Sequence, residues 1–440
     1  MGRIRHRNLS QSVQGSANKY GTAPTVGRNS FALRLFSIRV VPSKTDARAS
    51  ASAAVVAILA WVLKKELLAS NGAASDRFGR SVALDGDRAL VGANARNEGR
   101  GAAYIFDLFD GSWNQTADIS LGPVGVDRDF FGSSVALDGD RALVGAPYRD
   151  GPGDDNQGAA YIYELSDGSW NKTADISLGT DGSSNDQFGS SVALDGSRAL
   201  VGAYGRDDRK GAAYIFEYNG INWTKTADIS LGTDGSANDF FGYSVALDGS
   251  RALVGAYGRG GDDRKGAAYI FDLSSSGIWS EPTDISLGTD GIDFDNFGIS
   301  VALDGDRALV GATGRGDLST GAAYIYDLTG NTWSQTTDIS LGPVGNGNDH
   351  FGSSVALDGD RALVGADGRD EFKGAAYIFD TTDGTTWSEP KEISLGTDGA
   401  DDDYFGNSVA LDGDRALVGA DGRGGDDKGA AYIYDYERTN

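Results

Sequence analysis

Short apolar runs alternate with polar turns along most of the chain. Ser134–Leu137 is one such run, Asp138-Gly139 follows it, and a second run occupies Arg141–Val144 before Gly145-Ala146. Short apolar runs bounded by turn residues predict β-strands. Asp-Gly between two such runs predicts a two-residue type I′ hairpin. We therefore expect a pair of antiparallel strands here.

Two further strands complete the pattern. Ala159–Tyr163 follows a variable polar loop, and Thr173–Leu178 follows a Gly-rich turn and Trp170. A loop rich in Gly and Asp then leads to Phe188-Gly189, where the pattern starts again. Each unit is therefore predicted to be four short antiparallel strands.

The unit occurs seven times with few changes. Its copies are spaced by 53 to 57 residues and begin at Phe78, Phe131, Phe188, Phe241, Phe297, Phe351 and Phe405. Self-similarity at such a period indicates a repeat architecture, and four-stranded units repeated radially form β-propeller blades. We predict an all-β fold, a seven-bladed β-propeller of four-stranded antiparallel blades.

The Phe-Gly that opens each unit and the Gly-Ala that closes its second strand resemble FG-GAP repeats, the blades of integrin α-subunit propellers and of many secreted bacterial proteins. The resemblance covers residues 61–440. It implies an integrin-α-like propeller and an extracellular or cell-surface setting. It implies little about a specific activity, because propellers carry many unrelated functions.

Tryptophan spacing predicts how the ring closes. Each of the last six Trp residues lies 18 residues before a Phe-Gly, and Trp61 lies 17 before Phe78. The seventh unit ends after its third strand. We expect residues 61–70 to supply its fourth strand and to close the ring between the chain ends. The alternative is a helix over residues 51–69, which are rich in good helix formers.

Residues 1–60 differ in kind from the repeats. They carry nine Lys or Arg, one acidic residue and an apolar stretch at residues 51–63 that is too short for a membrane-spanning helix. The stretch matches the apolar core of a signal peptide, with Ala60 before a cleavage point. An organellar transit segment, a disordered tail and translated sequence upstream of the true start are the alternatives. We assign 1–60 to a basic tail and 61–440 to the propeller.

The formal net charge is −24, although the first 60 residues are basic. So acidic a ring is expected to repel nucleic acid and anionic lipid. No membrane span is expected within the propeller, which we expect to be a monomer. The chain has no Cys, which excludes disulfides and thiol chemistry.

Residues present in every copy are predicted to be structural. One Asp stands two positions before each Phe-Gly, as Asp129 does, and is expected to accept backbone N–H groups in the turn that enters the first strand. One Arg follows each hairpin, as Arg141 does, and is expected to pair with the neighbouring blade.

The family resemblance would imply calcium in the loop between the first two strands. Here that loop is reduced to Leu137-Asp138-Gly139-Asp140-Arg141, which offers too few oxygen ligands for a cation that takes 6–8 of them. We expect no metal and no cofactor. The Asp-rich loops before Phe-Gly are the alternative location for calcium.

Catalytic constellations are scarce. The chain has two His, His6 in the tail and His350 beside Phe351, and no nucleophile signature surrounds either one. A carboxylate pair could serve a hydrolase, but acidic residues are too numerous for a pair to be diagnostic. We predict that the protein is not an enzyme and rank a carboxylate-based enzyme third.

The variable loops between the second and third strands are the predicted ligand contacts. By strand parity they emerge on the same face as the loops before Phe-Gly. The candidates are Tyr148, Arg149, Tyr204, Arg206, Tyr257 and Arg259, since aromatic and Arg side chains often anchor interfaces. We predict an interaction module for adhesion or scaffolding with a protein ligand. The alternatives are a carbohydrate-binding propeller with a glycan site in each blade, and an Arg–Asp lattice that only neutralises itself.

Overall fold

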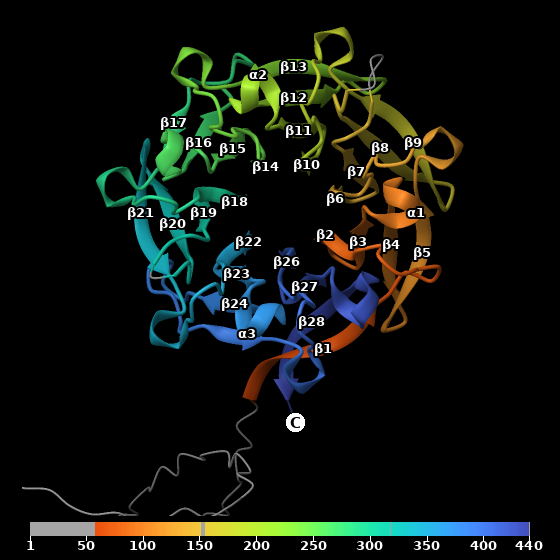
Figure 1. Cartoon of the computed structure of the whole chain (residues 1–440), viewed down its shortest axis with the longest axis vertical. Helices are drawn as coiled ribbons and strands as arrows, with labels where there is room; N and C mark the ends of the chain where they lie inside the picture. The colour runs from red at the N-terminus through yellow and green to blue at the C-terminus, as the bar shows by residue number, and fades with distance from the viewer. Residues whose placement is uncertain (1–57, 151–154, 317, 440) are drawn as a thin grey trace, which may run out of the picture. The chain divides into compact units, whose positions relative to one another are not determined.

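Seven four-stranded antiparallel sheets surround a central axis in the computed structural model, which describes residues 58–150, 155–316 and 318–439 (Figure 1). The predictions for residues 1–57 lie outside the described residues. Within the ring, each sheet runs outward from its first strand to its fourth. The predicted architecture of seven four-stranded blades is confirmed.

The first three blades use consecutive strands. Blade 1 consists of β2 (Phe78–Asp85), β3 (Arg88–Ala93), β4 (Ala102–Phe109) and β5 (Ser112–Ile119). Blade 2 consists of β6 (Ser134–Asp138), β7 (Arg141–Ala146), β8 (Ala159–Ser166) and β9 (Ser169–Ile176). Blade 3 consists of β10 (Val192–Asp195), β11 (Arg198–Ala203), β12 (Ala212–Tyr218) and β13 (Trp223–Ile229).

The next three follow the same order. Blade 4 consists of β14 (Ser244–Asp248), β15 (Arg251–Ala256), β16 (Ala267–Asp272) and β17 (Thr283–Asp284). Blade 5 consists of β18 (Phe297–Asp304), β19 (Arg307–Ala312), β20 (Ala322–Thr329) and β21 (Thr332–Ile339). Blade 6 consists of β22 (Phe351–Asp358), β23 (Arg361–Ala366), β24 (Ala375–Asp380) and β25 (Lys391–Ile393).

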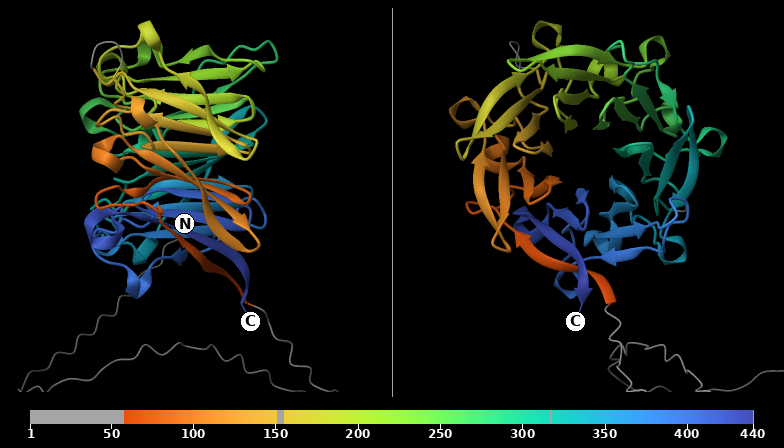
Figure 2. Two further views of the ribbon diagram at one scale, coloured as in Figure 1. Left: turned by 90° about the vertical axis from the view of Figure 1, so that its right-hand side faces the viewer. Right: turned by 180° about the vertical axis from the view of Figure 1, so that it is seen from behind.

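Blade 7 joins the two ends of the ring. It consists of β26 (Val409–Asp412), β27 (Arg415–Ala420), β28 (Ala430–Thr439) and β1 (Ile58–Leu67), and β1 pairs antiparallel with β28 (Figure 2). The predicted closing strand is confirmed, and it begins slightly before Trp61. Over residues 58–67 the helical alternative is wrong.

The core lies between neighbouring blades. Phe188 is fully buried and packs against Tyr214 and Phe216 of its own blade. The same cluster includes Leu143 of the preceding blade. The second strand of every blade is buried along its whole length except at its first residue. A strand buried on both faces requires a continuous apolar run, which the repeated Ala-Leu-Val-Gly-Ala supplies.

The hairpin between the first two strands forms as predicted, but its turn type differs from the prediction. Asp85 pairs with Arg88, so the turn residues are Gly86 and Asp87 rather than Asp85 and Gly86. Gly86 has φ = +55°, whereas Asp87 is not in the left-handed region. A Gly at the first turn position is the arrangement of a type II′ turn. The Asp85 side chain is thereby available for a contact outside the turn.

The outer strands depart from the predicted positions. In blade 2 the outer strand begins at Ser169, before Trp170, whereas the sequence pattern placed its start at Thr173. In blades 4 and 6 it shrinks to two and three residues. Pro282 and Pro390 stand just before these short strands, and Pro cannot donate a hydrogen bond to a sheet.

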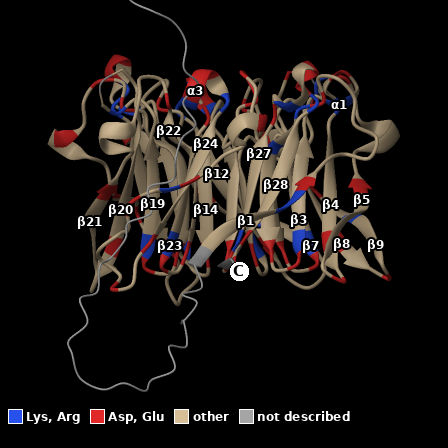
Figure 3. Ribbon diagram, turned by 90° about the horizontal axis from the view of Figure 1, so that it is seen from below, with Lys and Arg blue, Asp and Glu red and all other residues tan. Residues whose placement is uncertain are grey.

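The ring has two different faces (Figure 3). The loop face carries the connections between the second and third strands and those that enter the first strands. These connections touch, since Arg128 N donates to Glu98 O and Phe130 N donates to Gly99 O. The opposite, hairpin face carries the short turns. The predicted sharing of one face by the two loop sets is confirmed.

Short helical turns occur in the loops. They are α1 (Arg96–Gly99), α2 (Arg206–Arg209), α3 (Arg369–Phe372), η1 (Gly122–Val124), η2 (Gly179–Asp181), η3 (Gly232–Asp234), η4 (Gly261–Asp263), η5 (Gly288–Asp290), η6 (Gly342–Val344), η7 (Gly396–Asp398) and η8 (Arg423–Asp427). Residues 58–439, as far as the structure describes them, contain no helix long and apolar enough to cross a bilayer.

Candidate functional site

A buried Asp–Arg clamp organises the loop face of every blade. Asp239 is 0% exposed, and its Oδ2 accepts hydrogen bonds from Ser236 N at 2.8 Å and Arg259 Nη1 at 2.7 Å. The seven clamps are Asp76–Arg96, Asp129–Arg149, Asp186–Arg206, Asp239–Arg259, Asp295–Arg315, Asp349–Arg369 and Asp403–Arg423. The predicted role of this Asp as an acceptor of backbone N–H groups is confirmed.

Three of the predicted ligand-binding residues belong to these clamps: Arg149, Arg206 and Arg259. Arg206 Nη1 also donates to Asp181 O, and Arg259 Nη1 donates to Asp234 O, both at 2.6 Å. Each guanidinium therefore ties the loop after the second strand to the loop that precedes Phe-Gly. Arg149 forms the same ion pair with Asp129, whose pKa is raised by burial. A ligand role for these three Arg stays a prediction, and their shared contacts are structural.

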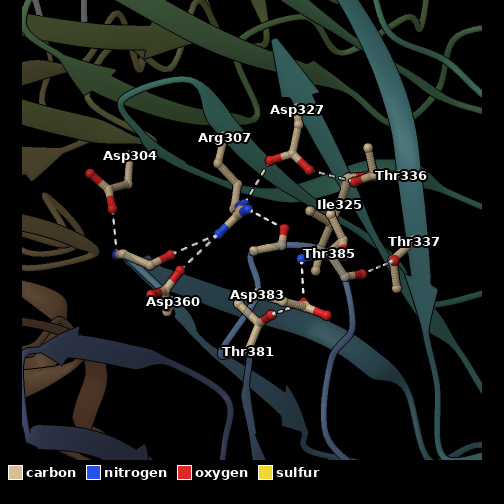
Figure 4. Close-up of polar contacts among 12 residues, drawn as sticks. Asp304, Arg307, Ile325, Asp327, Thr336, Thr337, Asp360, Thr381, Asp383 and Thr385 are labelled. Carbon is tan, nitrogen blue, oxygen red and sulfur yellow. Dashed lines mark hydrogen bonds and ion pairs between the residues drawn. The ribbon is translucent and has the colours of Figure 1, made fainter. Parts of the chain in front are cut away.

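A second repeated network joins neighbouring blades on the hairpin face. Asp304 accepts the backbone N–H of Gly359, and Arg307 reaches from Asp327 of its own blade to Gly359 O of the next (Figure 4). The guanidinium of Arg307 also lies 5.3 Å from the ring centre of Trp387 in the next blade. At the other six interfaces, the carboxylate that accepts the N–H of the Gly in the next blade's hairpin belongs to Asp85, Asp138, Asp195, Asp248, Asp358 and Asp412. The predicted pairing of this Arg with the neighbouring blade is confirmed.

Against this repeated framework, three positions near the axis vary from copy to copy. The residue before Phe-Gly is Arg77, Phe130, Gln187, Phe240, Asn296, His350 or Tyr404. The residue after Phe-Gly is Arg80, Ser133, Ser190, Tyr243, Ile299, Ser353 or Asn407. The residue after Gly-Ala is Asn94, Pro147, Tyr204, Tyr257, Thr313, Asp367 or Asp421.

These variable positions meet at the central opening of the loop face, which we call the mouth. A hollow of about 340 Å³ there is lined by Arg80, Ser133, Tyr243, Ile299, Thr313, His350, Ser353, Asp367 and Asn407. Six of the seven blades contribute to it, and only the axis is accessible to so many blades. The mouth therefore brings together, on one surface, variable residues from six blades.

One half of the mouth is aromatic. The Phe240 ring stacks on Tyr257 with centroids 4.9 Å apart, and Tyr243 packs against Tyr257 and against Tyr204 of the preceding blade. Burial raises the pKa of Tyr204, and the neighbouring Tyr148 raises it further. A continuous row of rings thus runs across blades 2 to 4.

The other half of the mouth is charged. Asp421 is 5% exposed, and burial raises its pKa. Arg80 Nη1 lies 3.7 Å from Asp421 Oδ2 and is partly exposed. His350 Nδ1 lies 3.4 Å from Asp367 Oδ1, and this contact raises the pKa of His350. The mouth therefore offers apolar rings on one side and ionisable groups on the other.

Of the three predicted Tyr residues, Tyr204 and Tyr257 pack against Tyr243, which lines the mouth, and Tyr148 packs against Phe130. Sequence reasoning missed Phe240 and Tyr243, which complete the row, and also the charged residues of blades 6 and 7. The sequence did contain a signal for these residues, because the positions on both sides of Phe-Gly vary in copies that are otherwise nearly identical. Within the described part of the chain, no group of three His, Cys, Asp or Glu residues could hold a metal ion.

Comparison with known proteins identifies the repeat. No curated protein matches the chain. A family model described as FG-GAP repeat matches residues 61–106, 113–163, 170–216, 223–271, 279–326, 333–379 and 387–434. Its first segment begins at Trp61, in the strand that closes the ring. The chain belongs to the FG-GAP repeat family, whose propellers are commonly protein-interaction modules and are typical of extracellular domains.

Proposed function

We propose that this propeller is an extracellular adhesion or scaffolding module that binds a protein ligand at the mouth of its loop face. The observation that carries the proposal is that three variable positions of each blade converge on the axis. The clamps, the first hairpins and the core residues around them repeat from blade to blade.

The composition of the mouth suits an interface. Tyr243 is 36% exposed and belongs to a supported row of rings, so its contact surface is held in place before a ligand arrives. Aromatic side chains are frequent energetic anchors of interfaces, and a rigid anchor loses little conformational entropy on binding. The turns between the first two strands on the hairpin face are nearly identical in all seven blades, so they offer little variation from which to build a specific site.

The contacts of the Trp residues weigh against a glycan site in every blade. In six of seven blades an Arg guanidinium lies about 5 Å from the indole centre, as Arg251 does above Trp333. A sugar needs an accessible ring face for stacking. The repeated Trp is better explained as part of the blade-to-blade packing.

The test is a screen of the full chain against purified extracellular domains and a glycan array, with and without calcium. Binding by a protein hit should fall at least tenfold in Y204A, Y243A and Y257A, which remove anchors of the aromatic row. The matched controls are S197A and S250A, exposed positions of the hairpin face, which should bind normally. Equal loss in both sets, or loss in the controls alone, contradicts the proposal.

A further inference from the structure

A second candidate site lies on the hairpin side of the ring, between blades 6 and 7. It is a groove of about 780 Å³, lined among others by Thr382, Thr386, Trp387, Lys391, Asp414 and Tyr436. Small-molecule sites usually fall between about 300 and 1,000 Å³. The groove therefore has the size of a ligand site, and it is separate from the mouth.

The groove follows from a local departure of blade 6 from the repeat. Thr381 stands where blades 1, 2, 4 and 5 have Leu108, Leu165, Leu273 and Leu328. The turn that follows it is bound to blade 5, since Gly384 O accepts from Arg307 Nη2 at 2.6 Å and Thr385 O accepts from Thr337 (Figure 4). Pro390 then delays the outer strand until Lys391. The turn is thus held toward blade 5, and its other side forms a wall facing blade 7.

The walls carry polar groups that are not used by the fold. Within the described residues, neither the Thr382 hydroxyl nor the Tyr436 phenol forms a hydrogen bond, and both line the groove. Lys391 Nζ donates a hydrogen bond to Asp380 Oδ2 at 2.5 Å, and this contact holds the Lys391 side chain in place at the edge of the groove. Trp387 and Tyr436 also line the groove. Arg307 lies over the Trp387 ring and Arg361 over the Tyr436 ring, so a sugar would pack on the part of each ring that these cations leave open to the groove.

This combination points to one ligand chemistry. A pyranose ring has an apolar C–H face that packs on aromatic rings, and a rim of hydroxyls that both donate and accept hydrogen bonds. Four lining carboxylates, Asp358, Asp360, Asp380 and Asp414, outnumber the two lining cations, Arg361 and Lys391. An anionic sugar would be repelled by this excess. We propose that the groove between blades 6 and 7 binds a neutral oligosaccharide.

The chain contains its own control. Tyr218 stands at the position in blade 3 that Tyr436 holds in blade 7. The guanidinium of Arg141 lies 5.1 Å from the ring centre of Tyr218. The guanidinium of Arg361 lies 4.9 Å from the ring centre of Tyr436. Blade 2, however, has Leu165 in place of Thr381 and a regular outer hairpin. The two Tyr residues therefore share the packing contact, and Tyr218 lacks the adjoining polar turn.

The experiment is saturation-transfer NMR followed by calorimetry on the full chain. The probes are cellobiose, maltose, lactose and chitobiose, with digalacturonic acid as the anionic comparison. We expect at least one neutral disaccharide to bind and digalacturonic acid to bind more weakly. T382V, which removes an exposed hydroxyl and keeps the side-chain shape, and Y436A should each weaken binding about tenfold. Y436F should lose less than Y436A, and Y218A should bind as the parent does.

Each result supports or contradicts the binding of a neutral oligosaccharide in the groove. Absence of binding by all four neutral probes at concentrations well above about 1 millimolar, the Kd of a weak complex, overturns the proposal. Binding that survives T382V, or that falls equally in Y218A and Y436A, also overturns it. Thermal melts of every variant identify a folding defect, and T382V, at an exposed position, keeps the test valid if Y436A does not fold. Loss of the mouth ligand in Y243A with sugar binding retained separates this groove from the proposed function.

Discussion

Arg361 lies over the indole of Trp61, with its guanidinium carbon 5.0 Å from the ring centre. Arg361 belongs to blade 6, and Trp61 belongs to the strand that completes blade 7. The same contact joins Arg415 to Trp113 at 5.1 Å in the next interface around the ring. The closure between the chain ends is therefore built like an ordinary blade-to-blade contact.

Removal of residues 1–70 should destabilise the ring far more than removal of residues 1–57. The larger deletion removes β1 and leaves β28 as an open edge, which favours aggregation. W61A should cost about 2–3 kcal/mol of unfolding free energy, since the indole is half-buried. Thermal melting and light scattering measure both effects. Equal melting temperatures for the two deletions would show that closure does not depend on β1.

R259A should lower the free energy of unfolding by about 3 kcal/mol, because it leaves the fully buried carboxylate of Asp239 without its cation. Urea denaturation measures the loss, and R206A should behave alike. Y257A and S250A serve as matched controls in the same blade, one at the mouth and one on the hairpin face. If R259A instead abolishes ligand binding while its stability is unchanged, the clamp interpretation is wrong.

Two glycines of blade 4 should respond differently to alanine. Gly242 has φ = +85°, and a Cβ there would lie 2.3 Å from Ala212 O, so G242A should prevent the blades from packing. Gly249 has φ = +56° and open space around it, so G249A should cost about 1–3 kcal/mol of backbone strain and cause no clash. Yield and melting temperature distinguish the two. Similar melts would contradict the close approach of the backbones at Gly242.

His350 should titrate above its usual pKa of 6.5, because the Asp367 carboxylate beside it favours the charged ring. A raised folded-state pKa means that the pair stabilises the fold fully below about pH 6.5 and loses this contribution as the pH rises through the folded value. NMR titration of the imidazole should show the shift, and D367N should return it toward 6.5. An unshifted titration in the parent would mean that the pair does not form.

Chelator should leave the melting temperature within a degree or two of the untreated protein. A calcium site filled at about 100 times its dissociation constant would add about 2.7 kcal/mol, which a thermal melt resolves. A large drop would place calcium in the Asp-rich loops before Phe-Gly. A melt with added magnesium in place of calcium is the control for ionic strength.

The blade architecture was predictable because the same pattern of strands and turns occurs seven times in the sequence. The closing strand followed from the spacing of Trp61, although Ala, Leu, Lys and Glu in the same stretch are good helix formers. Pairing with β28 outweighs that local preference, since isolated propensity is weak compared with tertiary contacts. The turn type was mispredicted because Asp85-Gly86 and Gly86-Asp87 both resemble hairpin dipeptides, and only the register of the flanking strands separates them.

The candidate site was predictable only in part. Tyr204 and Tyr257 were found because they stand in variable loops. Tyr243 was missed because it follows Phe-Gly in a segment that otherwise looks structural. The partners of Arg206 and Arg259 could not be deduced either, since a surface Arg and a clamped Arg look the same in sequence. Only the structure distinguishes the two cases, because it shows that Asp186 and Asp239, the partners of these Arg side chains, are buried.

The seven clamps and the seven hairpin contacts repeat nearly the same geometry around the ring, so the blades are close to interchangeable structural units. Exchanging the three mouth residues of one blade for those of another would leave the clamps and the hairpin contacts in place, and would change only contacts at the mouth itself, such as Arg80 with Asp421. The mouth can therefore be rewritten blade by blade, which makes this chain a scaffold for combinatorial design of binding surfaces.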